Sequence, residues 1–357
     1  MTLNRDDILA TLAKIIDPTS GKDLITADYV RGLTIEGANV RFVLEVPPQH
    51  GPTMEPLRVV AERAVAGLPG VDKVSVLLTA HADKAPPPDL KIGRHPTPQK
   101  GEGKARIAGV RHLVAIGSGK GGVGKSTVAS NLAVALAAQG LKVGLLDADI
   151  YGPSQPRMMG VSERPKSPDG KTIIPLHAHG VTLMSMGLMI GEAEAVVWRG
   201  PMLMGALQQL LGQVEWGALD VLLIDLPPGT GDVQLTLGQR YEVKGAVIVS
   251  TPQDVALLDA RKAIDMFHKL DVPILGMIEN MSTHICRNCG HEEQIFGHGG
   301  ARAEAEAQGA PYLGALPLDL DIRLAGDAGT PIVAAKPDSA QARAFEAIAR
   351  ELAKLLS

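Results

Sequence analysis

A glycine-rich segment about a third of the way along the chain constrains the fold more than any other feature. It has the pattern G-x-x-x-x-G-K-[ST], and its residues are Gly119, Lys120, Gly121, Gly122, Val123, Gly124, Lys125, Ser126 and Thr127. A short apolar run, Leu113–Gly117, precedes it, and a stretch rich in Ala and Leu follows it. A strand, this pattern and a helix in succession are typical of a phosphate-binding loop in an α/β domain.

Each part of the loop has a chemical purpose in binding a nucleotide. The glycines let backbone N–H groups turn toward phosphate oxygens, and the following helix adds the positive end of its dipole. Lys125 is expected to reach the β- and γ-phosphates, and the Ser126 hydroxyl to bind Mg²⁺. An ordinary glycine-rich turn would need neither group at these offsets. We therefore predict that the loop from Gly119 to Thr127 binds ATP with Mg²⁺.

The rest of this region alternates short apolar runs with helical patterns. Continuous apolar strands of this kind are buried on both faces, so we predict a mostly parallel sheet covered by helices on both sides. A last helix over Gln341–Leu356 carries an apolar stripe and mixed charges, and we expect it to dock on this domain. The expected strands are Leu113–Gly117, Val143–Asp147, Val181–Met186, Val221–Asp225, Ala246–Ser250, Ile274–Ile278 and Tyr312–Ala315.

A smaller unit precedes the nucleotide-binding region. Apolar spacing predicts a helix over residues 4–16, strands at 30–35 and 40–46, a helix at 54–68 and a strand at 71–78. The next segment holds five prolines and six Lys or Arg residues against three acids, which is typical of an extended linker. We predict a small α+β domain at 1–80, a flexible linker at 81–108 and a P-loop ATPase domain at 109–357.

Composition excludes several classes of partner. Aromatic residues make up only 3% of the chain and the net charge is −4, so neither base stacking nor electrostatics favours nucleic acid. No apolar run approaches the roughly 20 residues that a membrane-spanning helix needs, and the first residues lack the pattern of a secretory signal. Two closely spaced cysteines suit a reducing compartment. We predict a cytoplasmic protein.

Two of the predicted strands end in carboxylates. Asp147 and Asp149 follow one apolar run, and Asp225 ends another. An acid at a strand end often only caps a helix, but two such ends in one sheet beside a phosphate loop indicate a site. We expect Asp225 to hold Mg²⁺ through water and Asp147 to support the same ion.

The only two cysteines, Cys286 and Cys289, lie together as Cys-Arg-Asn-Cys. Three interpretations of this pair are open from spacing alone. With His284 and His291 it could form a zinc site within one chain. It could be a redox dithiol, or it could supply half of a four-thiolate [4Fe–4S] site completed by a second chain.

The phosphate loop resembles the deviant loop of the nitrogenase iron protein, MinD, ParA and ArsA group. That resemblance implies that Lys120 reaches the nucleotide of the opposite subunit and stabilises the transferring phosphoryl group. It also implies that Asp149 orients the attacking water. Asn280, after a late strand, matches the position that contacts adenine in this group; taken alone, an Asn there is usually a turn former.

Several further segments together resemble the Mrp/ApbC family of iron–sulfur cluster carrier ATPases. The resemblance implies a homodimer whose Cys286 and Cys289 bridge a labile [4Fe–4S] cluster between subunits, with cluster scaffold proteins and apo iron–sulfur proteins as partners. The matching segments are the phosphate loop, Asp147–Ser154, Trp198–Met202, Asp225–Asp232, Glu279–Ser282, the cysteine pair and Phe296–Gly300.

The N-terminal unit resembles the small domain of iron–sulfur assembly proteins, through the segment Asp17–Leu24. Members of that group commonly carry a cysteine after the second strand, whereas residues 47–53 here contain no thiol. The resemblance therefore implies a docking role for this domain.

Two rival functions are distinguished by the same residues. A spatial-positioning ATPase of the ParA/MinD type would share Lys120, Lys125 and Asp149, but its function would not need the cysteines, which would only bind a structural zinc. An electron-transfer reductase like the nitrogenase iron protein takes one cysteine from each of two separated loops, and this chain has no second cysteine site.

Overall fold

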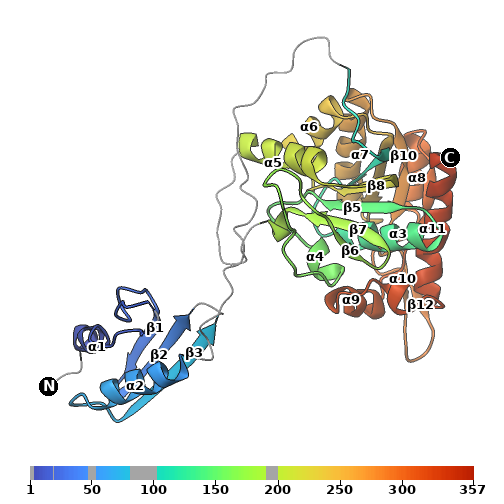
Figure 1. Ribbon diagram of the computed structural model, residues 1–357. Coiled ribbons are helices and arrows are strands. Elements are labelled where there is room, and N and C mark those ends of the chain that lie inside the picture. The colour runs from blue at the N-terminus through green and yellow to red at the C-terminus, as the bar shows by residue number, and fades with distance from the viewer. Residues whose placement is uncertain (1–3, 19, 47–53, 81–102, 190–199) are drawn as a thin grey trace. The chain divides into compact units, whose positions relative to one another are not determined.

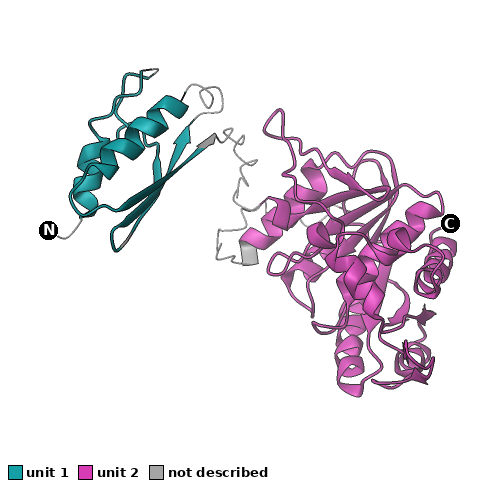
Figure 2. Cartoon of the chain, turned by 90° about the horizontal axis from the view of Figure 1, so that it is seen from below, with its two compact units in different colours: residues 1–86 teal, residues 87–357 magenta. Residues whose placement is uncertain are grey.

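The computed structural model describes residues 4–18, 20–46, 54–80, 103–189 and 200–357. Within it the chain forms two compact units, Met1–Pro86 and Pro87–Ser357, which Figure 2 colours separately. Most of the predicted linker, the loop at 47–53, and Trp198 and Arg199 lie outside the described residues.

The first unit is a three-stranded sheet with two helices. Strand β2 lies in the middle, antiparallel to β1 and parallel to β3, and its alternate residues Val40, Phe42 and Leu44 are buried in the core of this unit. The predicted order α-β-β-α-β is confirmed. The elements are α1 (Arg5–Leu12), β1 (Val30–Glu36), β2 (Asn39–Val46), α2 (Glu55–Ala66) and β3 (Lys73–Ala80).

Helix α1 is shorter than its apolar spacing predicts. It ends at Leu12 instead of continuing to residue 16. Beyond it, Leu24 N donates to Ile15 O and Asp17 N donates to Lys22 O, so residues 15–17 pair with the segment that follows. Ile15 is buried outside the helix, where its backbone pairs with a segment nine residues along the chain, and helical periodicity does not reveal this pairing.

The second unit is built on an eight-stranded sheet (Figure 1). Its order is β13-β10-β9-β4-β8-β5-β7-β6, and every pairing is parallel except that of β6 with β7 at the edge. The predicted α/β class is confirmed. The strands are β4 (Val110–Gly117), β5 (Val143–Asp147), β6 (Leu176–Ala178), β7 (Val181–Ser185), β8 (Leu219–Asp225), β9 (Gly245–Ser250), β10 (Ile274–Glu279) and β13 (Tyr312–Ala315).

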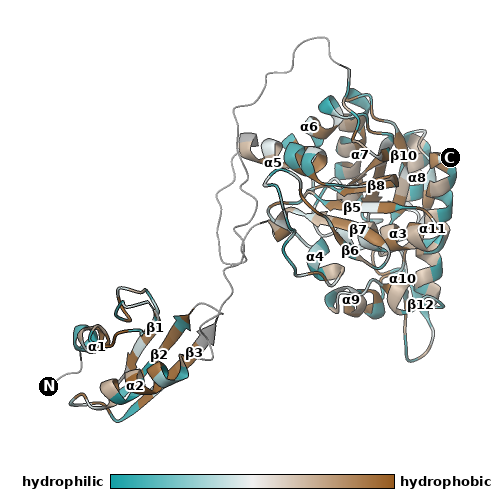
Figure 3. Ribbon diagram, viewed as in Figure 1, coloured by the Kyte–Doolittle hydropathy of each residue, from teal (hydrophilic) through white to brown (hydrophobic). Residues whose placement is uncertain are grey.

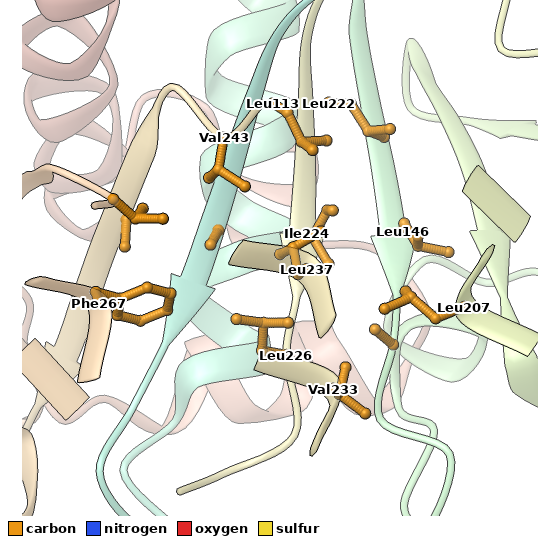
Figure 4. Packing of buried hydrophobic residues seen from close by; sticks show 14 of the residues in the cluster. Leu113, Leu146, Leu207, Leu222, Ile224, Leu226, Val233, Leu237, Val243 and Phe267 are labelled. Carbon is orange, nitrogen blue, oxygen red and sulfur yellow. The ribbon is translucent and has the colours of Figure 1, made fainter. Parts of the chain in front are cut away.

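Helices cover both faces of this sheet, and a separate hydrophobic core fills each interface. Helices α5 to α8 pack on one face, where the residues in Figure 4 lie, while α3 and α9 to α11 pack on the other. Figure 3 shows the strands between these layers as predominantly hydrophobic. The helices are α3 (Lys125–Ala138), α4 (Gln155–Met158), α5 (Gly200–Gln213), α6 (Asp232–Arg240), α7 (Asp254–Lys269), α8 (Gly300–Ala307), α9 (Leu320–Asp327), α10 (Ile332–Ala335) and α11 (Ala340–Leu356).

The last helix docks on the domain, as its mixed charges predict. Helix α11 packs along α3, and three residues of the predicted stripe, Phe345, Ile348 and Leu352, are buried. The fourth, Leu355, is exposed, so the stripe does not dock along its whole length. In the described part of the chain, no helix is both long and apolar enough to span a bilayer.

Candidate functional site: a phosphate loop and a cysteine hairpin

The predicted phosphate loop lies at the carboxyl edge of the sheet. It connects β4 to α3, and β4 has β8 and β9 as its neighbours, with β5 beyond β8. Because parallel strands all end at the same edge, this order brings the loop next to the acids that end β5 and β8. Asp147 and Asp225 are register partners across that pair of strands.

Two glycines of the loop are required by close packing. A Cβ on Gly119 would lie 2.0 Å from the backbone carbonyl carbon of Asp259 in α7. Gly124 has φ +80°, and a Cβ there would lie 2.2 Å from Nδ2 of Asn280. The loop is thus held between α7 and the segment after β10, and only glycine fits at either contact.

A buried ion pair links the loop to β8. Lys125 Nζ binds Oδ1 of Asp225, and Lys125 also donates to Ser126 Oγ over 3.2 Å. The other oxygen of Asp225 accepts from Nε2 of Gln155 at 2.8 Å, and the same nitrogen lies 2.9 Å from the carbonyl oxygen of Ser126. Gln155 therefore joins the loop, the acid of β8 and the start of α4.

Asp147 accepts four hydrogen bonds. The backbone N–H groups of Asp149, Ser154 and Gln155 donate to it over 3.0 to 3.1 Å, as does the Ser185 hydroxyl over 3.1 Å. The pKa of Asp147 is raised to about 7, mainly because the carboxyl group is buried and secondly because the charge of Asp225 repels it. Through these hydrogen bonds Asp147 fixes the backbone that follows β5, and its pKa depends on the other charges at this edge of the sheet.

The residues at this edge fit a magnesium nucleotide. Two buried carboxyl groups lie beside a single ammonium group, a balance of charge that suits a divalent cation. Ser154 Oγ and Gln155 Oε1 are buried and have no hydrogen-bond partner in the part of the chain that the structure describes. Oxygen atoms of carboxylates, hydroxyls, amides and water are the ligands that Mg²⁺ takes in proteins.

The other predicted nucleotide-site residues lie around the same loop. Lys120 is half-buried, and its ammonium group forms no ion pair within the described residues. Asp149 is half-buried, and its Oδ1 accepts from Gly152 N at 3.2 Å. Asn280 is buried, with Nδ2 donating to Val123 O at 2.8 Å, so it contacts the loop itself. The segment after β8 also reaches this region, because Gly229 N donates to the carbonyl oxygen of Ser118, just before the loop, at 3.0 Å.

The cysteines lie in a hairpin that follows β10, at the same edge of the sheet. This cysteine hairpin comprises β11 (His284–Ile285), the turn with the cysteines and β12 (Glu292–Glu293). Cys286 is half-buried and Cys289 is exposed. Hydrogen bonds from the backbone N–H groups of Cys289 and Asn288 lower the pKa of the Cys286 thiol, which favours the thiolate that binds metals.

The hairpin does not gather a complete metal site of its own. Among the described residues, no group of three or more His, Cys, Asp or Glu side chains could hold a metal ion. His284 instead places Nδ1 3.0 Å from the carbonyl oxygen of Leu318. The single-chain zinc alternative, which needed both histidines as ligands, therefore has no ligand set in this structure.

Comparison with known proteins identifies the family. Residues 109–353 match the model described as ParA, NUBPL iron-transfer P-loop NTPase, and residues 5–77 match the model described as iron–sulfur cluster assembly protein. A Synechocystis protein named iron–sulfur cluster carrier protein is 44% identical over 362 residues, covering 99% of this chain and 98% of that one. One of the same name from Salmonella typhimurium is 55% identical over 248 residues, covering 69% of this chain and 66% of its own. The chain belongs to the iron–sulfur cluster carrier protein family.

Solved structures agree on the fold of the carrier's large unit. A nucleotide-binding protein from Archaeoglobus fulgidus, in complex with ADP, is 40% identical with a TM-score of 0.55, covering 62% of this chain and 87% of that one. The cell division ATPase MinD of Pyrococcus furiosus is 26% identical with a TM-score of 0.52, covering 69% and 99%. The predicted family resemblance and the predicted P-loop fold are both confirmed.

Sequence reasoning missed the polar residues, most of them buried, that connect these parts of the carrier. Gln155 and Ser185 hold the acids of β8 and β5, yet neither follows a recognised spacing. Glu279, Ser282 and His298 form a hydrogen-bonded group at the base of the cysteine hairpin. They fall in segments that resemble the family, which was the one available signal, but their residue types alone suggest no role.

Proposed function

We propose that this carrier is a homodimeric ATPase that holds a labile [4Fe–4S] cluster between its two subunits and transfers it to apo-proteins. The observation that carries the proposal is the cysteine hairpin, which presents two thiols near the surface and no third ligand among the described residues. Two such half-sites make the four thiolates that a cubane cluster takes. Ligands that are exposed in each chain suit a cluster that must leave.

For the nucleotide, we infer the following division of work. Lys125 exchanges its contact with Asp225 for phosphate oxygens, and the backbone N–H groups of the loop surround the same anion. Asp225 and Asp147, with Ser126, would hold the oxygen shell of a bound Mg²⁺, which would supply positive charge next to the phosphates. Asp149 orients the attacking water, and Asn280 lies where the resemblance puts the base.

Lys120 supports the dimer part of the proposal. Its side chain is not committed to an ion pair in the described part of its own chain. A lysine in this state can neutralise charge on a nucleotide held by the facing subunit. The same face-to-face arrangement brings the two cysteine hairpins together, so one dimer accounts for both features.

We also propose that the N-terminal unit, residues 1–80, serves as a docking module on the tether at 81–108. Its match to the assembly-protein model supports a contact with cluster scaffold proteins or apo iron–sulfur proteins. Because the chain's only cysteines lie in the hairpin, this unit supplies no thiol ligand.

Anaerobic reconstitution with ferrous iron and sulfide tests the proposal. The wild-type chain should give a brown protein with one cluster per two chains, and Cys286→Ala and Cys289→Ala should each lose it. His291→Ala is the matched control, since it removes a possible ligand from the same hairpin and should keep the cluster. Absence of iron, or iron retained in both cysteine variants, would rule out the carrier mechanism. Zinc at one ion per chain would favour a structural zinc in a positioning ATPase.

A further inference from the structure

The segment after β10 contacts both the phosphate loop and the cysteine hairpin. Asn280, immediately after the strand, donates to Val123 O in the loop. Met281 follows with φ +57°, a left-handed conformation that is uncommon for a residue with a side chain. His284, three residues later, begins the hairpin. Only residues 281–285 therefore separate Asn280, at the phosphate loop, from Cys286, the first of the proposed cluster ligands.

A buried carboxylate closes the base of the hairpin. Glu279 is fully buried, and its Oε1 accepts from the Ser282 hydroxyl at 2.7 Å and from Gly299 N at 2.9 Å. Its Oε2 accepts from Ala301 N at 2.8 Å, in the first turn of α8. One side chain thus binds the residues just before the hairpin and the residues just after it.

His298 completes this group from the far side of the hairpin. Its Nδ1 lies 2.5 Å from Ser282 Oγ. When the Ser282 hydroxyl donates to Glu279, the tautomer that fits this contact carries the proton on Nδ1 of His298, which then donates to Ser282 Oγ. We call Glu279, Ser282 and His298, with the backbone N–H groups of Gly299 and Ala301, the Glu279 clamp.

The outer end of the hairpin is held separately. Arg287, between the two cysteines, forms ion pairs with Asp319 at 2.9 Å and Asp321 at 2.8 Å, next to the start of α9. These pairs are partly exposed, so they restrain the hairpin less than the buried clamp does. A shift at the clamp would therefore move the base of the hairpin, and the more weakly held turn that carries both thiols would move with it.

We propose that the Glu279 clamp transmits nucleotide occupancy of the phosphate loop to the cysteines, with Ser282 as the positioning residue between them. The inference rests on the proposed function, because it assumes that nucleotide and cluster act on each other. Nucleotide that displaces Asn280 from Val123 O shifts the chain at Met281. Ser282 and Glu279 then carry that shift to both ends of the hairpin.

The chain's two cysteines allow a direct test without iron. A chromogenic thiol reagent applied to the reduced, cluster-free full chain reports only on Cys286 and Cys289. In the wild type, saturating Mg·ATP should change the modification rate about fivefold or more, the lower end of typical coupling between sites. In Ser282→Ala the ratio of the modification rates with and without Mg·ATP should fall below about twofold, while the ATP dissociation constant stays within about threefold of the wild-type value.

Three further variants make the test specific. Thr283→Ala, which removes the neighbouring hydroxyl outside the clamp, should respond like the wild type, and Ser282→Thr should restore the response. His298→Ala, at a side chain that is 45% exposed, gives the same test if Ser282→Ala does not fold. The inference is overturned if bound ATP leaves the wild-type rate unchanged, or if folded Ser282→Ala or His298→Ala keeps the full response. Failure of iron binding would refute the proposed function but would leave this measurement unaffected.

Discussion

Replacing Lys125 with Met would isolate the electrostatics of the candidate nucleotide site. Methionine keeps most of the length and the apolar stem of the lysine, and it removes the ammonium group with its charge and its hydrogen-bond donors. Lys125 is 6% exposed and its partner Asp225 is fully buried. In the variant, Asp225 keeps the hydrogen bond from Gln155 but loses its cation, and it still lies beside Asp147.

The magnitude follows from burial of the remaining charge. Removing one partner of a buried ion pair typically costs 3–5 kcal/mol, about 3 to 5 times the value of an exposed pair. For a domain of this size the loss corresponds to a decrease of roughly 10 °C in the melting temperature. A buried carboxyl without its cation takes up a proton, so the loss should be larger at pH 8 than at pH 5.5.

The assay is urea unfolding of the nucleotide-free protein, with Lys125→Met/Asp225→Asn as the matched variant. Removing both charges should recover most of the stability, because no unpaired charge is left in the site. Neither variant should bind nucleotide, since each lacks the ammonium group of Lys125. A loss below about 1 kcal/mol in Lys125→Met, or a double variant as unstable as the single one, would refute this reasoning.

Three other substitutions test separate parts of the structure. Asp147→Asn should remove a pH dependence of stability. Because the folded pKa of Asp147, about 7, lies above the ordinary 3.8, the unfolding free energy of the wild type should fall by up to about 1.4 kcal/mol per pH unit between pH 4 and 7. An equal slope in the variant would contradict this. Gly119→Ala places a Cβ 2.0 Å from the Asp259 backbone and should cost on the order of 3 kcal/mol in urea unfolding, whereas Gly121→Ala, with 3.8 Å to its nearest neighbour, should cost under about 1. Phe345→Ala should lower the unfolding free energy by about 3–5 kcal/mol, and Leu355→Ala, at the stripe residue that is 38% exposed, by far less; similar losses would show that α11 does not dock through the buried part of its stripe.

The sheet of the large unit was predictable because its strands are short apolar runs with polar ends. Asp147 and Asp225 each end a run and each ends a strand, β5 and β8. The antiparallel edge strand β6 was not predicted, since its three residues are partly exposed and carry no periodicity. The predicted end of α1 was wrong for a related reason, because residues 15–17 pair with residues 22–24 instead of continuing the helix.

The candidate site divides in the same way. The loop residues and the strand-end acids follow a spacing whose chemistry is known, so they could be named from the sequence. Gln155 and the Glu279 clamp act through contacts between segments that only the fold brings together. The spacing of the cysteines also left the identity of their metal open. The structure adds only that the described residues supply no third ligand for a metal site within one chain.

Native mass spectrometry of the anaerobically reconstituted protein tests the central claim most directly. The account predicts one species with the mass of two chains and one [4Fe–4S] cluster. In Cys286→Ala this species should be absent, and no cluster mass should be detected. A complete cluster on a single chain, or one zinc ion per chain without iron, would contradict it.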